Sequence, residues 1–68
     1  MKEIKVKPNT EIKNFIKICM NLSGGESKFV IKNEMVKVNG IIENRPSHKI
    51  ENNDIVEFEN NIFKAIIE

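Results

Sequence analysis

Residues 23–40, SGGESKFVIKNEMVKVNG, hold all three glycines of this 68-residue chain and decide its fold. Ser23 and Glu26 have the S-x-x-E spacing of a capping box, in which each side chain accepts a hydrogen bond from the other residue's backbone N–H. The spacing predicts a helix over residues 24–33. Gly24 and Gly25 weaken a helix less in its first turn than in its interior, and without a β-carbon they let a ligand approach the free backbone amides.

The faces of this predicted helix differ in chemistry. Lys28 and Lys32 are four residues apart and therefore lie together on one flank. Phe29 lies roughly opposite the core side, where it either stacks on an unpaired base or, as we expect, packs under a neighbouring strand. The predicted core side carries Ser27, Val30, Ile31 and Glu34.

The second half of the segment predicts a hairpin. Residues 35–42, MVKVNGII, have a period of two and contain Asn39-Gly40, the strongest short-range hairpin signal. The polar, basic stretch at 44–49 predicts a loop, because Pro46 cannot donate to a sheet ladder. The strands expected after the helix cover residues 36–39, 41–44, 55–59 and 62–67.

The sequence before residue 23 predicts a strand and another helix. Residues 3–6 alternate as a short edge strand does, and Thr10 is expected to cap a helix over residues 11–20. Lys13 and Lys17 lie beside the apolar stripe of this helix, which consists of Ile12, Phe15, Ile16 and Cys19. The elements together predict an α+β fold in one domain, residues 1–68, with two helices packed on a small antiparallel sheet of four to five strands.

Size and composition exclude several classes of protein. A chain this short buries only about 60% of its unfolded surface, which leaves room for one thin core and no deep catalytic pocket. A single cysteine excludes an internal disulfide and indicates a reducing compartment. The N-terminus lacks the apolar segment of a secretory signal, and no apolar run approaches the about 20 residues of a membrane helix. We therefore expect a cytoplasmic monomer that is no enzyme and has no membrane association, metal or cofactor.

Charge is distributed unevenly along the chain, although the formal net charge is only +1. Residues 1–37 carry eight lysines against four glutamates, and residues 38–49 carry two basic groups against one acid. Residues 50–68 reverse this balance, with five acids against one lysine. The asymmetry suggests one face that attracts a polyanion and another that repels it, although scattered solvated charge is the alternative.

Taken together, the basic first helix, SGGESKFVIKNEMVKVNG, the basic loop and NNDIVEF (52–58) resemble the S4-type RNA-binding domain over residues 11–58. The nearest resemblance is to small bacterial proteins that consist of little else. It implies an αL-type motif that binds structured RNA of the ribosomal or transfer RNA class without catalysis, and a ribosomal or translation-factor partner. The RNA-binding residues that the resemblance implies are Lys13, Lys17, Gly24, Lys28, Lys32, Lys37, Asn39, Arg45 and Lys49.

Some alternatives stay open at this stage. The acidic last strand and Phe29 also suit a protein-interaction module of the translation machinery in which RNA contact is secondary. His48, the single histidine, either contacts a phosphate, more strongly below about pH 6.5 where imidazole is protonated, or is an ordinary loop residue. Cys19 is expected to be a small core residue rather than a nucleophile.

Overall fold

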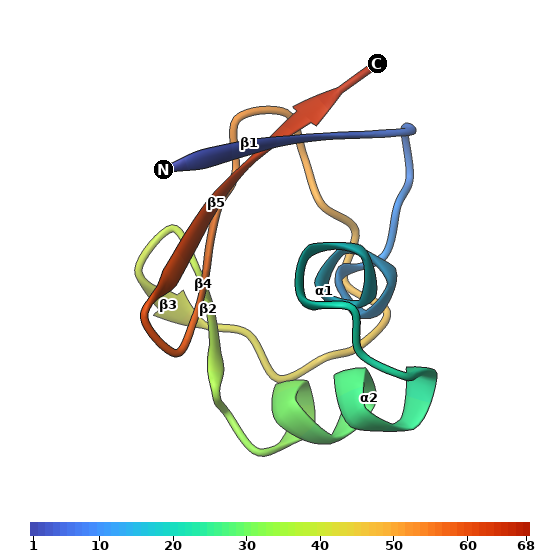
Figure 1. The fold of residues 1–68 in the computed structure, drawn as a ribbon, viewed down its shortest axis with the longest axis vertical. Helices are drawn as coiled ribbons and strands as arrows, with labels where there is room; N and C mark the ends of the chain where they lie inside the picture. Colours follow the sequence, from blue (N-terminus) through green and yellow to red (C-terminus); the bar gives the residue numbers. More distant parts are fainter.

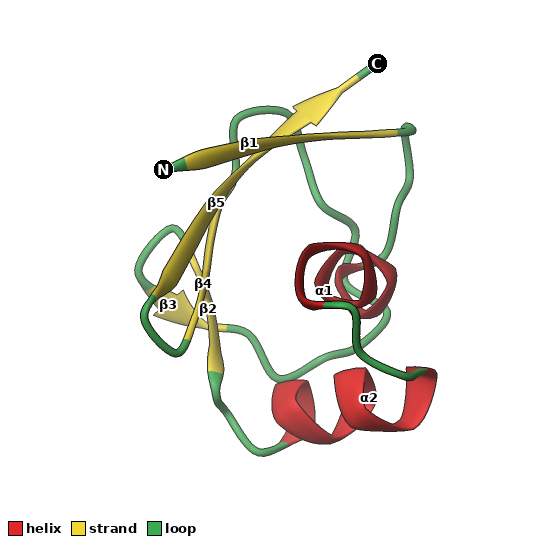
Figure 2. Cartoon of the chain, in the orientation of Figure 1, coloured by secondary structure: helices red, strands yellow, loops and turns green.

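Two helices lie against one side of a curved five-stranded sheet in the computed structural model, which describes residues 1–68 (Figure 1; Figure 2). The elements in chain order are β1 (Lys2–Val6), α1 (Ile12–Met20), α2 (Gly24–Lys32), β2 (Val36–Val38), β3 (Ile41–Ile42), β4 (Ile55–Phe58) and β5 (Asn61–Ile67). The expected α+β class and both helices are confirmed.

The sheet has the strand order β1-β5-β4-β2-β3 and is mixed rather than purely antiparallel. The pairs β2–β3, β2–β4 and β4–β5 are all antiparallel, as the hairpin signals predict. β1 lies at the edge, as expected, but it runs parallel to β5, with Lys2 opposite Phe63 and Val6 opposite Ile67. Between these two neighbouring strands the chain forms both helices and strands β2 to β4.

Both helices bury an apolar stripe against the same face of the sheet. Phe15, Ile16 and Ile31 are fully buried, as are Val36 and Val56 on the strands below them. The alternation along β4 and β5 decides which strand residues join them, since Val56 and Phe63 point inward and their neighbours point outward. The remaining members of the core are Val6, Ile12, Val30, Ile50, Phe58 and Ala65.

The start of α2 is built as predicted, whereas the start of α1 is not. In α2 the Ser23 N–H donates to Glu26 Oε1 at 2.9 Å and the Glu26 N–H donates to Ser23 Oγ at 3.1 Å, which completes the capping box. In α1 the cap residue is Glu11, without a side-chain cap hydrogen bond, so the expectation for Thr10 is wrong. The Thr10 hydroxyl instead donates to the carbonyl of Lys7 at 2.6 Å.

Left-handed backbone conformations follow the ends of β2 and α2. Asn39 and Gly40 have φ values of 53° and 82°, as a hairpin turn after β2 requires. Glu34 has a φ of 62° and lies beyond the end of α2, so it is exposed and does not join the helix face on which it was expected. The second hairpin strand stops at Ile42 rather than at residue 44, although the Glu43 N–H still donates to the carbonyl of Val36 at 3.0 Å.

Candidate nucleic-acid interface

The loop of residues 43–49 lies on the first turn of α1. The Ile12 N–H donates to the carbonyl of His48 at 2.7 Å, and the Lys13 N–H donates to the carbonyl of Pro46 at 3.2 Å. Helix N-termini leave such amides without partners inside the helix, so the loop satisfies two of them. This contact brings the basic loop beside the first basic helix, although more than 30 residues separate them in the chain.

Glu43 holds this loop together. Its carboxylate accepts from the Arg45 side chain at 2.9 Å (Nε to Oε2) and 3.1 Å (Nη2 to Oε1), and from the Arg45 backbone N–H at 3.0 Å. His48 Nδ1 lies 3.4 Å from Glu43 Oε1 and 3.5 Å from Arg45 Nη2. Hydrogen bonds from the Arg45 side chain hold the pKa of Glu43 below its ordinary value, and the same contact raises the pKa of Arg45.

Residue-by-residue reasoning from the sequence missed Glu43, which is the only acid in residues 38–49. The available signal was its position two residues before Arg45. A single carboxylate next to a basic loop, however, is ordinarily interpreted only as lowering the positive charge of that loop. Only the fold shows that its side chain is just 11% exposed while that of Arg45 is 70% exposed.

A second acid, Glu11, lies between two predicted binding residues. Lys13 Nζ lies 3.2 Å from Glu11 Oε1, and Lys49 Nζ lies 4.0 Å from Glu11 Oε2. Residues 11 and 49 also form an isolated β-bridge. The structure therefore brings Lys13, Lys49 and the Arg45 loop together around the start of α1, with two carboxylates among them.

The amino-terminal tip of α2 has two amides that are open to solvent. The capping box uses the N–H groups of Ser23 and Glu26, whereas those of Gly24 and Gly25 make no hydrogen bond. No atom lies within 4 Å of where a β-carbon would stand on either glycine. Hydrogen bonds from Ser23 hold the pKa of Glu26 below its ordinary value, so a carboxylate already occupies part of this tip.

A hydrogen bond joins the two helices that carry the predicted lysines. Ser27, which is fully buried, donates from its hydroxyl to the carbonyl of Lys13, which ties the two helices together. The next residue, Lys28, and its partner one turn on, Lys32, are exposed and form no ion pair. Lys17 is likewise exposed and unpaired, one turn beyond Lys13.

Two predicted binding residues are placed differently. Lys37 lies on the sheet face that the helices do not cover, because Val36 is buried and the side chains alternate along β2. Asn39 is exposed, but its side chain has a role in the fold: its amide donates to Asp54 Oδ1 at 3.0 Å and its Oδ1 accepts from the Ile55 N–H at 2.9 Å. An RNA contact for either residue stays a prediction.

The burial expected for Cys19 is observed, whereas the burial expected for Phe29 is not. The expectation that Phe29 packs under a strand is wrong, since 62% of the residue is exposed. It lines an apolar groove of about 330 Å³ with Leu22, Val30 and Phe58.

Cys19 packs against the core as expected. Burial raises its pKa to about 12, so its thiol is not a thiolate nucleophile at neutral pH.

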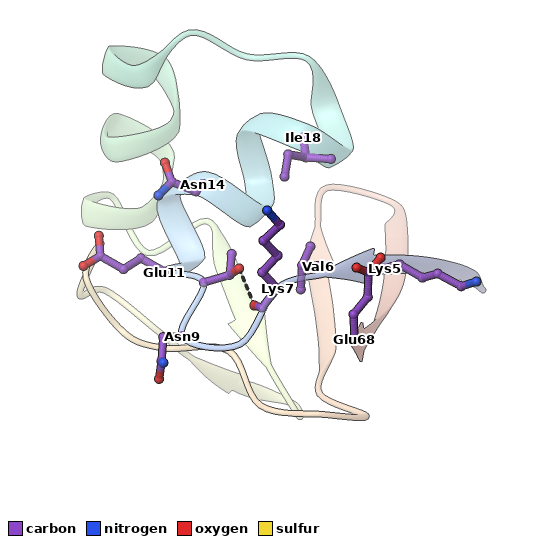
Figure 3. A pocket seen from close by; sticks show the side chains of 9 residues that line it. Lys5, Val6, Lys7, Asn9, Glu11, Asn14, Ile18 and Glu68 are labelled. Atoms are coloured by element: carbon purple, nitrogen blue, oxygen red, sulfur yellow. Dashed lines mark hydrogen bonds between the residues drawn. The ribbon is translucent and has the colours of Figure 1, made fainter.

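The largest hollow of the surface lies elsewhere, between β1, the start of α1 and the C-terminus. It measures about 630 Å³ and is open and polar. Figure 3 shows Lys7 extending along α1 toward Ile18, whereas Lys5 and Glu11 point outward on opposite sides.

No three His, Cys, Asp or Glu side chains gather anywhere to hold a metal ion. Neither helix has the length and apolar character that crossing a bilayer requires.

Comparison with known proteins identifies the family of this chain. The family model described as "S4 domain" matches residues 3–66, so the chain belongs to the S4 domain family. This membership implies RNA binding in general, by a domain that is itself non-catalytic. A solved structure titled "Crystal structure of pseudouridylate synthase" is similar with a TM-score of 0.73 and 26% identity over 79% of this chain, which corresponds to 24% of that chain. No curated protein sequence matches the chain.

Proposed function

We propose that residues 1–68 act as one non-catalytic unit that binds structured RNA of the ribosomal or transfer RNA class. The observation that carries this proposal is the seating of the basic loop on α1, which gathers Arg45, Lys49 and Lys13 from distant parts of the chain. The flank of α2 with Lys28 and Lys32 extends this basic surface, because Ser27 joins α2 to the backbone of Lys13.

The chemistry of the surface suits recognition of the shape and backbone of a folded RNA better than recognition of a particular base sequence. Duplex RNA hides its base edges in a deep, narrow groove, so proteins read its shape, phosphates and 2′-hydroxyl groups. Lysines one helical turn apart can contact successive phosphates, and the two open amides at the tip of α2 can add hydrogen bonds to another. The partner we infer is therefore a structured RNA with duplex segments, as ribosomal and transfer RNAs are.

A salt series tests the electrostatic part of the proposal. If about four phosphates are engaged, the logarithm of the association constant for ribosomal RNA fragments falls with the logarithm of salt concentration at a slope of about −3 to −4. Fluorescence anisotropy measures the slope, with DNA hairpins of the same sequence as the comparison. A response to salt near zero contradicts the proposal.

Reversing the charge of two lysines tests whether this flank of α2 belongs to the RNA-binding surface. Lys28→Glu combined with Lys32→Glu should abolish binding and leave the melting curve nearly unchanged, because both side chains are exposed and unpaired. The matched control is Lys5→Glu with Lys64→Glu, which changes net charge equally on the sheet face away from the helices. Equal losses from the two pairs would show that net charge, and not this flank, governs binding.

A second candidate function is a protein-interaction module of the translation machinery. The exposed Phe29 and its apolar groove favour it, since large exposed apolar groups often mark contact sites. Capture of a protein partner that persists after RNase treatment and is lost in Phe29→Ser would favour this function over direct RNA binding.

A further inference from the structure

The guanidinium of Arg45 is held on one side and free on the other. Of its five N–H groups, the Nε–H and one on Nη2 donate to Glu43. The two N–H groups on Nη1 make no hydrogen bond within the protein, Nη2 also lies 3.5 Å from His48 Nδ1, and 70% of the side chain is exposed. The planar, forked shape of the group means that fixing one edge also fixes the direction of the other edge.

The anchor of this arrangement is rigid. Glu43 is nearly buried, its backbone N–H donates to the carbonyl of Val36 at 3.0 Å, and its carboxylate also accepts from the Arg45 backbone. The His48 ring lies beside this pair, with Nδ1 3.4 Å from Glu43 Oε1 and 3.5 Å from Arg45 Nη2. The loop carbonyls of Pro46 and His48 are in turn held by α1. An exposed arginine without such an anchor samples many rotamers, and binding has to select one of them.

We propose that Glu43 is a positioning residue for RNA binding: it holds the Arg45 guanidinium so that the two N–H groups of Nη1, which have no partner in the protein, donate to an RNA phosphate. This inference rests on the proposed function and adds to it a negatively charged group that aids the binding of a polyanion. The hydrogen bonds from the Arg45 side chain lower the pKa of Glu43, as an ion pair between these two side chains requires.

The direction in which a single substitution changes the affinity for RNA tests the inference. Glu43→Gln removes a negative charge near the RNA, so simple electrostatics predicts tighter binding. If Glu43 positions Arg45, the same variant instead binds ribosomal RNA fragments about five-fold more weakly, since the bidentate contact loses its charge and fixed direction. Glu11→Gln is the matched control: it removes an equal charge beside the same loop and frees Lys13 and Lys49, so it should bind more tightly.

A double-mutant cycle shows whether Glu43 acts through Arg45. Arg45→Ala should lower the magnitude of the salt slope by about one, as the loss of one phosphate contact does. Adding Glu43→Gln to Arg45→Ala should cause no further loss of affinity. Arg45→Lys should bind almost as weakly as Arg45→Ala, because an ammonium group cannot bridge the carboxylate and a phosphate with one planar fork.

A measurement without RNA separates this inference from the proposed function. In the folded protein the Nε–H signal of Arg45 should be protected from exchange in NMR spectra and lost in Glu43→Gln, while melting curves show whether the variant is folded at the assay temperature. Tighter RNA binding by Glu43→Gln, or an equal loss in the Arg45→Ala background, overturns the inference while the salt series still upholds RNA binding. A wild-type protein that fails the salt series overturns both.

Discussion

Two polar side chains show how single residues shape the molecule around the basic loop. Asn39 links the β2–β3 turn to the start of β4 through its two hydrogen bonds, and Glu43, which directly follows β3, joins Arg45 and His48. The sequence predicts Asn39 as a turn residue and, by the resemblance, as an RNA-binding residue, whereas Glu43 enters only the count of charges. Their partners lie in other elements, so only the fold reveals what their side chains contact.

The ionisation of Glu43 predicts how stability depends on pH. Its pKa is lowered in the folded state from the ordinary 4.5, so its stabilising contribution is fully present above that value and is lost as pH falls through the lower folded value. The difference in the free energy of unfolding between wild type and Glu43→Gln should therefore shrink between pH 7 and acid pH. Urea titrations at each pH measure it. A difference that is constant down to pH 3, or that grows, contradicts the role of this carboxylate.

Among the elements, α2 combines a complete capping box with a first turn that contains two glycines. The capping box was predictable from four residues, because the geometry of a helix start is local. The exposure of Phe29 was not predictable in the same way, since the helix period shows only that it lies opposite the core and not whether a strand reaches it. The start of α1 shows the same limit: the loop of residues 43–49, and not a side chain of the preceding residues, satisfies its amides.

Substitution of Gly25 separates the stability of α2 from its function. Gly25→Ala should stabilise the fold by about 0.5 kcal/mol, because alanine restricts the unfolded chain and meets no atom within 4 Å. It should also weaken RNA binding, since the new methyl group hinders the approach of a phosphate to the open amides. Thermal melts and anisotropy titrations measure the two effects.

The matched control for this substitution is Ser23→Ala. It removes a cap and should destabilise the fold by about 1 kcal/mol while leaving both glycine amides open. If Gly25→Ala binds RNA as tightly as wild type, the tip of α2 is not part of the interface.

The whole molecule depends on one thin core between two helices and one face of the sheet. Its apolar members were largely predictable, because the helical stripe of α1 and the alternation in β4 and β5 mark them in the sequence. The parallel pairing of β1 was not, since alternation fixes which face a strand buries but not its partner or its direction. For the candidate site, the sequence identified most of the exposed cations but neither of the carboxylates between them.

A core this small should not survive the loss of one large side chain. Phe15 is fully buried, so Phe15→Ala should cost about 3–5 kcal/mol, which is as much as a core in a domain of this length usually supplies. The variant should be unfolded at room temperature by circular dichroism. Ile18→Ala on the same helix is the control and should change stability by less than about 0.5 kcal/mol, because Ile18 is 61% exposed. Cooperative melting of Phe15→Ala near the wild-type temperature would show that the core extends beyond these residues.

The pairing of β1 with β5 also has a mechanical consequence. The two strands run in the same direction at the edge of the sheet, so the chain enters at one end of this pair and leaves at the other (Figure 1). A tension applied between the two termini therefore slides the strands past each other and loads the hydrogen bonds from Lys2–Phe63 to Val6–Ile67 together. Such a shear geometry resists stretching far better than a hairpin that opens one bond at a time, so a pull on the ends should meet its main resistance at this edge.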